Sequence, residues 1–213
     1  HGNPMTQSAK LYNFIPYKMK NVETGEIDYD ELRALALKHK PKIVLAGFSA
    51  YPRELDYEKF VEIGNEVGAL LMADMAHIAG LIAGGVAVNP LDKGFHVITT
   101  TTHKTLRGPR GGLILSRGTV STPLRAPEKT LENIPTLIDR AVFPGMQGGP
   151  HEHIIAAKAV AFGEALKPEF KTYAKQIVKN AKVLADAMLE RGFTLITGGT
   201  SNHLILADVN KSF

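Results

Sequence analysis

Apolar residues along the chain form two patterns: short continuous runs, and longer segments with helical spacing. Continuous runs are typical of buried strands, and spacings of three and four residues are typical of amphipathic helices. The runs predict strands at residues 42–48, 69–73, 97–102, 113–115, 193–196 and 204–209. The helical spacing predicts helices from Asp28 to Lys40, from Asp56 to Val67, and at residues 153–166 and 169–191; residues 78–82 form a short apolar segment that breaks at Gly84-Gly85.

Capping residues mark the ends of several predicted helices. Asp28 is a candidate N-cap with Glu31 three residues later, and Asp56 begins the next helix. Gly68 and Gly192 are expected to end their helices. Residues 1–29 are expected to be irregular. The last long helix is predicted to turn one apolar stripe inward: Phe170, Tyr173, Ile177, Ala181, Leu184 and Met188.

Strands and helices alternate at intervals that suit crossover connections, which predicts an α/β fold with a mostly parallel sheet covered by helices. Residues 117–140, with three prolines, are expected to form a loop or lid with one short helix. We expect residues 1–192 to form a large domain and residues 193–213 to begin a smaller one. Because the chain opens without Met and stops just after a predicted strand, we expect it to be truncated at both ends.

Composition removes several classes of function. The chain has 213 residues, 44% of them hydrophobic and 22% charged, so it can bury a sizeable core. It has no cysteine, which excludes disulfides and thiolate metal sites. The net charge of +4 is scattered and only 7% of residues are aromatic, which argues against nucleic acid as a partner. No apolar run is long enough for a membrane, and no leader is evident, so we expect a cytoplasmic location, with an organelle matrix as the alternative.

One tripeptide looks like part of a metal site. His151-Glu152-His153 stands at the start of a predicted helix. We expect its two histidines to point apart, and no third ligand is evident, so no metal is predicted. The tripeptide is interpreted as helix-start surface, with His153 a candidate for packing inward.

Two opposite charges follow predicted strands. Asp74 ends the apolar run at residues 69–73, and Lys104 lies just past the run at residues 97–102. Ligands of open α/β sheets bind outside the carboxyl ends of the strands, so both charges are expected at one rim. Pyridoxal phosphate needs such a pair: an amine for its aldehyde and a carboxylate for its ring nitrogen. A buried salt bridge without chemistry is the alternative.

The residues around Lys104 favour the chemical interpretation. Four threonines, Thr99 to Thr102, precede His103 and Lys104, and the segment Gly108-Pro109-Arg110-Gly111-Gly112 follows. Threonine hydroxyls can donate to an anionic oxygen, and glycines let the backbone approach a ligand closely. The alternative is a tight turn that joins two strands.

A further set of motifs stands in a fixed order along the chain. They are His1-Gly2, Ser49-Ala50-Tyr51, Asp74-Met75-Ala76-His77, Thr99–Lys104, Gly108–Gly112, Phe143–Pro150 and Gly198–His203. With them the sequence resembles serine hydroxymethyltransferase along essentially its whole length. Small departures are Met146, at a variable position, and the length of the loop at residues 117–140.

The resemblance implies roles for five residues around the cofactor. Lys104 would hold pyridoxal 5'-phosphate covalently, and Asp74 would pair with its ring nitrogen. His77 would lie beside the ring, Ser49 would hydrogen-bond its oxygen side, and Thr101 would act near the lysine during turnover. From the residues alone, His77 could instead be a core histidine and Ser49 a turn cap.

Other implied roles lie further from the ring. His103 would contact the cofactor and influence which amino acids are accepted. Gly148 and Gly149 would offer N–H groups to a phosphate, usually that of the neighbouring subunit, although before Pro150 they also suit a plain helix entry. Arg110 would be structural or an inter-subunit contact.

The resemblance also implies a fold and a reaction. The fold is the large domain of the pyridoxal phosphate transferases, aspartate aminotransferase-like or fold type I. The reaction moves the hydroxymethyl group of serine to tetrahydrofolate, the co-substrate, and gives glycine and 5,10-methylenetetrahydrofolate in one-carbon metabolism. The full-length protein would be a homodimer or tetramer, and the piece alone is expected to be inactive. The alternatives are a folate-independent aldolase of β-hydroxy amino acids and a non-enzymatic α/β module.

Overall fold

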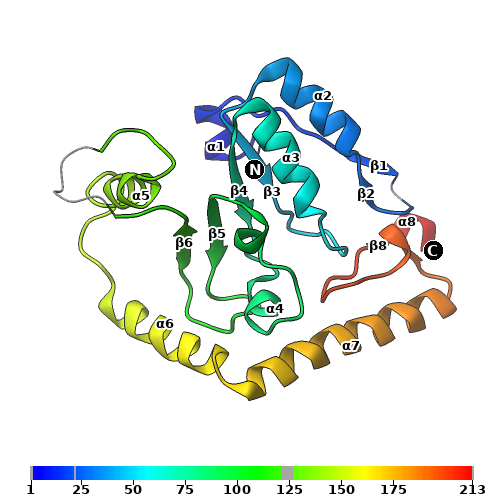
Figure 1. Ribbon diagram of the computed structural model, residues 1–213. Helices are drawn as coiled ribbons and strands as arrows, with labels where there is room; N and C mark the ends of the chain where they lie inside the picture. The colour runs from blue at the N-terminus through cyan, green and yellow to red at the C-terminus, as the bar shows by residue number, and fades with distance from the viewer. Residues whose placement is uncertain (1, 22, 121–126, 213) are drawn as a thin grey trace.

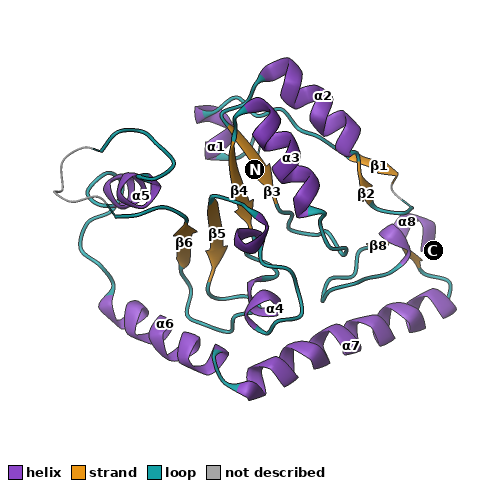
Figure 2. Ribbon diagram, in the orientation of Figure 1, coloured by secondary structure: helices purple, strands orange, loops and turns teal. Residues whose placement is uncertain are grey.

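A four-stranded sheet lies at the centre of the molecule (Figure 1). The computed structural model describes residues 2–21, 23–120 and 127–212. The strands stand in the order β3 (Ile43–Ala46), β4 (Leu70–Asp74), β5 (Val97–Thr101) and β6 (Gly112–Ser116). The first three are parallel, and β6 runs antiparallel to β5. The predicted α/β class with a mostly parallel sheet is confirmed, and Figure 2 shows helices and strands alternating around it.

Two capped helices pack beside this sheet. They are α2 (Tyr29–His39) and α3 (Tyr57–Val67), and α3 contacts both β3 and β4. Asp28 and Asp56 cap them as predicted, each accepting a backbone N–H three residues later. The Glu31 carboxylate does not close a capping box, since it accepts the backbone N–H of Lys18 instead. A left-handed Gly68 ends α3 as predicted.

The sheet core is a cluster of buried side chains between the sheet and these helices. Phe60 of α3 lies at its centre and contacts the rings of Tyr17, Tyr29 and Phe95 edge-on or tilted. Its members are Leu32, Ala36, Val44, Ala46, Tyr57, Phe60, Ile63, Ala69, Leu71, Ala73, Met75, Ala79, Phe95, Ile98 and Leu106. Each large side chain buried here stabilises the fold by about 1.5–3 kcal/mol. The core therefore fixes β3, β4 and β5 relative to one another.

Three helices form an arm along the outer edge of the sheet. The helical arm consists of α5 (Ile134–Val142), α6 (Glu152–Ala165) and α7 (Pro168–Glu190). The long helix predicted at residues 169–191 is confirmed in α7. The helix predicted in the loop at residues 117–140 is α5, which extends further, to Val142. Residues 121–126 of that loop lie outside the described residues.

The predicted inward stripe of α7 is wrong in part. Phe170 and Ala181 are buried as expected, but Leu184 is exposed, and Ala174 is buried in the contact with α4 (Ala79–Ala83). A Cβ added to Gly84 would lie 2.3 Å from the Ala174 Cβ. The backbones of α4 and α7 approach each other closely, so the two helices pack through small side chains. Large side chains of α7 such as Leu184 are exposed to solvent instead.

The first residues are more regular than predicted. The described part of residues 1–29 contains α1 (Gln7–Leu11) and the antiparallel pair β1 (Met19–Asn21) and β2 (Glu26–Ile27). A short η1 (Pro90–Lys93) precedes β5. None of the helices described here is long and apolar enough to cross a membrane.

The two strands predicted at the end are shorter than expected. They are β7 (Thr194–Leu195) and β8 (Ala207–Asp208), with η2 (Ile196–Gly198) following β7. Val209, expected in a strand, begins α8 (Val209–Ser212), where the Asp208 carboxylate accepts the N–H groups of Asn210 and Lys211. The predicted domain boundary at residue 192 stays a prediction.

The segment between η2 and β8 is fastened to the loop after β3. Arg53 donates to the carbonyl and the hydroxyl of Thr197. Asn202 donates through Nδ2 to the Tyr51 carbonyl at 3.1 Å. Asn202, near the end of the chain, is thereby brought next to the rim of the sheet.

Candidate active site

Lys104 and His77 meet at the carboxyl edge of the sheet. His77 follows β4 and Lys104 follows β5, and the two strands are parallel neighbours. The Lys104 Nζ lies 3.0 Å from the His77 Nε2. The lysine side chain is exposed, so its amine can meet a ligand from solvent.

Asp74, the last residue of β4, belongs to the same cluster. Its carboxylate accepts the backbone N–H of Ala76 at 3.1 Å and acts electrostatically on His77. Both charges predicted at this rim therefore act on one imidazole ring. A hollow of about 50 Å³ lies beside Asp74 and His77. It is far smaller than the roughly 300 Å³ typical of the smallest ligand pockets, so it does not contain a cofactor by itself.

The environment of His77 favours its neutral form. Partial burial and then the Lys104 charge lower the pKa of His77 below its ordinary value of 6.5, and the Asp74 charge opposes them. A neutral ring whose Nε2 carries the lone pair can accept a hydrogen bond from an ammonium group. The cluster thus combines an amine, a carboxylate and an uncharged imidazole.

The turn after β5 carries Lys104. Thr102 is fully buried, and its hydroxyl donates to the Pro109 carbonyl at 2.6 Å. Its carbonyl accepts the Gly108 N–H at 2.7 Å, which closes the loop that joins β5 to β6. The tight turn that joins two strands is therefore present, and it places Lys104 at the sheet edge; the chemical role of the segment stays a prediction. The Thr101 hydroxyl is buried with no hydrogen-bond partner among the described residues.

His103 lies next to Lys104 but contacts a different group. Its Nε2 is 3.2 Å from the Arg110 Nη1, and its Nδ1 accepts the Gly111 N–H at 3.4 Å. Arg110, predicted to be structural or an inter-subunit contact, thus orients the His103 ring. His103 itself is only partly buried.

No described contact joins the other three predicted site residues, Ser49, Gly148 and Gly149, to this cluster. Ser49 is exposed, three residues past the end of β3. Gly148 and Gly149 lie between α5 and α6 of the helical arm, exposed and with open space around their Cα atoms. Their predicted phosphate contact stays a prediction.

The two histidines at the start of α6 do not point apart as predicted. Their ring centroids are 5.7 Å apart, edge to face, because His151 is the N-cap with ψ of 86° and has not entered the helix. His153 is exposed, so the prediction that it packs inward is also wrong. No group of three or more histidines, aspartates or glutamates that could hold a metal occurs in the described ranges.

Two residues near the cluster were given no role from the sequence. Thr105 donates its hydroxyl to the His77 carbonyl at 3.0 Å and accepts the Gly80 N–H at 2.9 Å. His203, on the segment fastened to the β3 loop, has a buried Nδ1 without a partner among the described residues. Burial and then His77 lower the pKa of His203. Neither position carries a local signal, because both depend on segments brought together by the fold.

These residues fit pyridoxal phosphate. The exposed Lys104 amine can attach to its aldehyde, the Asp74 carboxylate can pair with its ring nitrogen, and the orphaned Thr101 hydroxyl is a free donor. An α/β domain with this set at the carboxyl edge of a parallel sheet has the features of a pyridoxal phosphate enzyme. Residues 1–212 match the family Serine hydroxymethyltransferase, and the chain belongs to that family. The family consists of one-carbon transferases that depend on pyridoxal phosphate.

Proposed function

We propose that the chain acts in the transfer of the serine hydroxymethyl group to tetrahydrofolate, which gives glycine and 5,10-methylenetetrahydrofolate. The observation that carries the proposal is the 3.0 Å approach of Lys104 Nζ to His77 Nε2 beside Asp74. The family match supports the reaction class. Fold type I, with β3–β6 as part of the large-domain sheet, belongs to the same proposal.

Three side chains would do most of the work. Lys104 would hold the cofactor through its amine and would give way to the amino group of serine. Asp74 would keep a proton on the ring nitrogen, and the ring would supply the electron sink that breakage of the serine Cα–Cβ bond requires. His77, whose pKa is lowered by partial burial and by Lys104, would contact the ring and the substrate carboxylate.

Other residues would tune the site. The Thr101 hydroxyl, which has no partner in the described chain, can donate to a ligand oxygen near Lys104. Ser49 would bind the oxygen side of the ring, and His103 would influence which amino acids are accepted. Gly148 and Gly149 would present N–H groups to the cofactor phosphate of a neighbouring subunit.

Covalent attachment tests the site directly. The chain is mixed with pyridoxal 5'-phosphate, and absorbance is followed near ~420 nm, where a lysine-bound cofactor absorbs. Borohydride then reduces the C=N bond formed from the amine and aldehyde with loss of water, and peptide mass spectrometry locates the label. We expect the label on Lys104, its loss in Lys104→Ala, and its retention in Lys182→Ala, an exposed lysine of α7 paired with Asp186. Absence of the label from Lys104 would support the non-enzymatic alternative.

Substrate dependence tests the reaction and is measured on an enzyme that contains this chain, because the piece alone is expected to be inactive. Glycine formed from serine only when tetrahydrofolate is present supports hydroxymethyl transfer. Glycine formed from a threonine-like substrate at the same rate without folate favours the aldolase. Asp74→Asn is expected to keep the cofactor attached and to lower turnover by about a hundredfold or more. Equal turnover in that variant would contradict the role given to Asp74.

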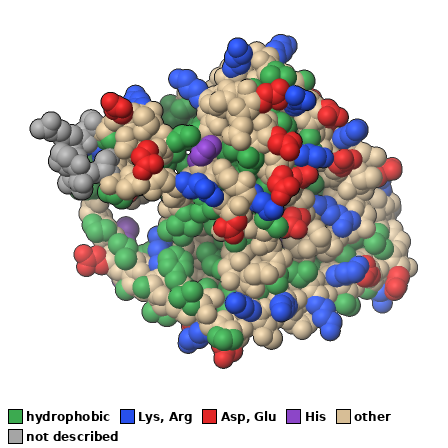
Figure 3. All heavy atoms as spheres, viewed as in Figure 1, with side chains coloured by type: hydrophobic (Ala, Val, Ile, Leu, Met, Phe, Trp, Pro, Cys, Tyr) green, Lys and Arg blue, Asp and Glu red, His purple; other side chains and the backbone are tan. Residues whose placement is uncertain are grey.

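Members of this family are usually oligomers, and we propose that this chain pairs with a second copy. Exposed apolar side chains gather along the helical arm, where Figure 3 shows them over α6. The arm also carries Gly148 and Gly149, which would serve the neighbouring site. A cytoplasmic location stays a prediction.

A further inference from the structure

Arg107 has an unusual backbone conformation within the turn that carries Lys104. Its φ is 59°, in the left-handed region that residues with a Cβ rarely adopt. The Arg107 N–H donates to the Lys104 carbonyl at 2.9 Å, and the next residue, Gly108, donates to the Thr102 carbonyl. Something outside the turn must therefore hold this conformation in place.

The Arg107 side chain supplies a contact of the right kind. Its guanidinium carbon lies 4.3 Å from the centre of the Tyr173 ring and 5.2 Å from that of Phe170, both on α7. Its Nη2 lies 3.8 Å from a carboxylate oxygen of Glu164 on α6. Phe170, the farther ring, is buried, and Tyr173, the nearer one, is 38% exposed. Stacking of this kind is a specific property of a planar cation.

The opposite side of the same turn is held by Thr105. Its hydroxyl joins the His77 carbonyl and the Gly80 N–H, and a Cβ added to Gly80 would lie 2.1 Å from the Thr105 carbonyl oxygen. Lys104 thus lies between two fixed points, the start of α4 on one side and the helical arm on the other. Without the Thr105 contacts or without the Arg107 contacts, the turn would be held on one side only.

We propose that Arg107 is a positioning residue that holds the Lys104 turn against α6 and α7 and so fixes the Lys104 amine beside His77. The inference rests on the proposed function, since it concerns the lysine that would bind the cofactor. Arg107 touches none of the reacting atoms. It acts through the four-residue turn, Lys104 to Arg107, that its own N–H closes onto the Lys104 carbonyl.

The test measures where pyridoxal 5'-phosphate attaches. At limiting cofactor, followed by borohydride, the fraction of label on Lys104 is compared with that on all other lysines. Arg107→Ala is expected to lower this fraction about threefold to tenfold, as the loss of both cation–π contacts predicts. Arg107→Lys keeps a cation over the Tyr173 ring and is expected to remain within about twofold of the wild type. The control is Arg33→Ala, which removes a guanidinium paired with Glu66 at 2.7 Å and should change nothing.

Arg107→Gly separates positioning from backbone relief. Glycine accepts a positive φ without strain, so a purely conformational role predicts wild-type labelling in this variant. Positioning by the side chain predicts the same loss as in Arg107→Ala. Wild-type selectivity in both variants would overturn the proposal.

Two further measurements keep the result decisive. If circular dichroism shows that Arg107→Ala does not fold, Tyr173→Leu takes its place, because it removes the aromatic ring and keeps an apolar side chain. The same decrease in the fraction of label on Lys104 is expected. Combined with Arg107→Gly, Tyr173→Leu should lose little more selectivity than either variant loses alone, and fully additive losses would contradict a shared contact between the two side chains. If Lys104 is not labelled in the wild type, the proposed function fails. If labelling stays selective for Lys104 in every Arg107 variant, only the positioning role of Arg107 is removed.

Discussion

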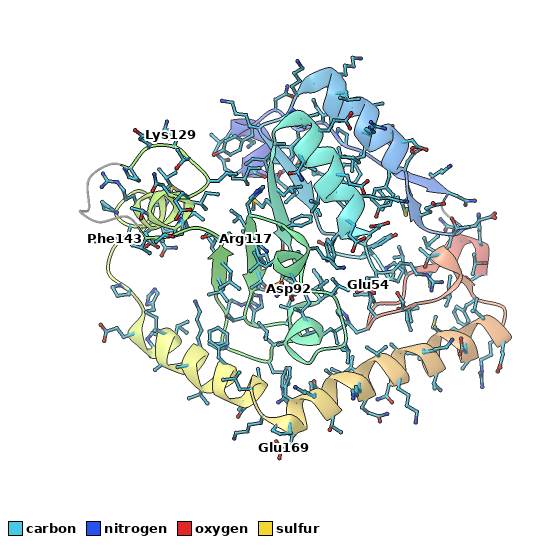
Figure 4. All side chains as sticks on the ribbon, in the orientation of Figure 1. Glu54, Asp92, Arg117, Lys129, Phe143 and Glu169 are labelled. Atoms are coloured by element: carbon cyan, nitrogen blue, oxygen red, sulfur yellow. The ribbon has the colours of Figure 1, made fainter. Side chains whose placement is uncertain are left out.

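The sheet core and the helical arm differ in how much of their apolar side chains is exposed to solvent. Phe60, Phe95 and Ile98 in the sheet core are 0% exposed. On the arm Val160 is 65% exposed, and Phe143, labelled in Figure 4 at the outer end of α5, is 62% exposed. The helices that cover the sheet bury the apolar side chains of its core. Among the described residues of α6, by contrast, Ala161 is the one buried residue.

The site lies where these two regions meet. Asp74 and His77 are fixed by β4 and the sheet core, while the Lys104 turn also touches α6 and α7 through Arg107. The core therefore supplies rigidity to one half of the site. The arm contacts one side of the other half and carries the exposed apolar surface that is proposed to meet a second copy. Substitutions matched across the two regions can test this division.

The largest difference is expected between two glycines. Gly47 follows β3 with φ of 111°, and an added Cβ would lie 2.0 Å from the Asp74 carbonyl oxygen. Gly47→Ala is expected to lower the free energy of unfolding by about 3 kcal/mol, from overpacking and a disfavoured φ together. Gly148→Ala on the arm meets nothing within 4 Å and should change it by less than about 0.5 kcal/mol. Urea denaturation measures both, and equal losses would show that the arm is as tightly packed as the core.

Much of the core could be predicted from the sequence because its signals are local. Asp28 and Asp56 capped the helices that they were expected to cap, and the apolar runs gave β3, β4 and β5. Errors came where packing decided the outcome. Leu184 is exposed because α7 meets α4 through Ala174 and Gly84, a fit that helical spacing does not encode.

The site was predictable in its strand-end residues and not in its supports. Asp74 and Lys104 follow consecutive parallel strands, and that order alone places them at one edge. Thr105, Arg107 and His203 act through contacts with residues far away in the chain, and no local motif marks such contacts. The left-handed φ of Arg107 carries no sequence signal either, since glycine is the residue expected there.

The second prediction concerns the arm's exposed apolar face. Val160→Lys is expected to weaken self-association about tenfold or more, because a valine buried between copies is worth about 1.5 kcal/mol. The stability of the separate chain should change by less than about 0.5 kcal/mol. Sedimentation equilibrium over a range of concentrations measures the association. Leu37→Lys on α2, also at a partly exposed apolar position, is the control and should leave association unchanged.

The smallest effect expected is a pH dependence of stability that arises in the sheet core and the site. Burial is the first cause that lowers the pKa of His77, His96 and His203 below 6.5, and Lys104 at His77 and Arg117 at His96 act in the same direction. The His96 Nδ1 accepts the Leu71 N–H at 2.9 Å, which requires that this nitrogen carry no proton. The folded state therefore binds fewer protons than the unfolded state just below pH 6.5, so stability is full above that pH and falls as the pH decreases through the lowered values.

Thermal midpoints at pH 7.5 and 5.5 test this dependence. His96→Asn keeps a side-chain acceptor near the Leu71 N–H and removes a titrating group, so it should hold its midpoint at pH 7.5 and lose less than the wild type at pH 5.5. His96→Ala leaves that N–H without an acceptor and should be less stable at both pH values. A wild-type midpoint that rises on acidification would contradict the assignment, because folding would then favour the protonated rings that the core is argued to exclude.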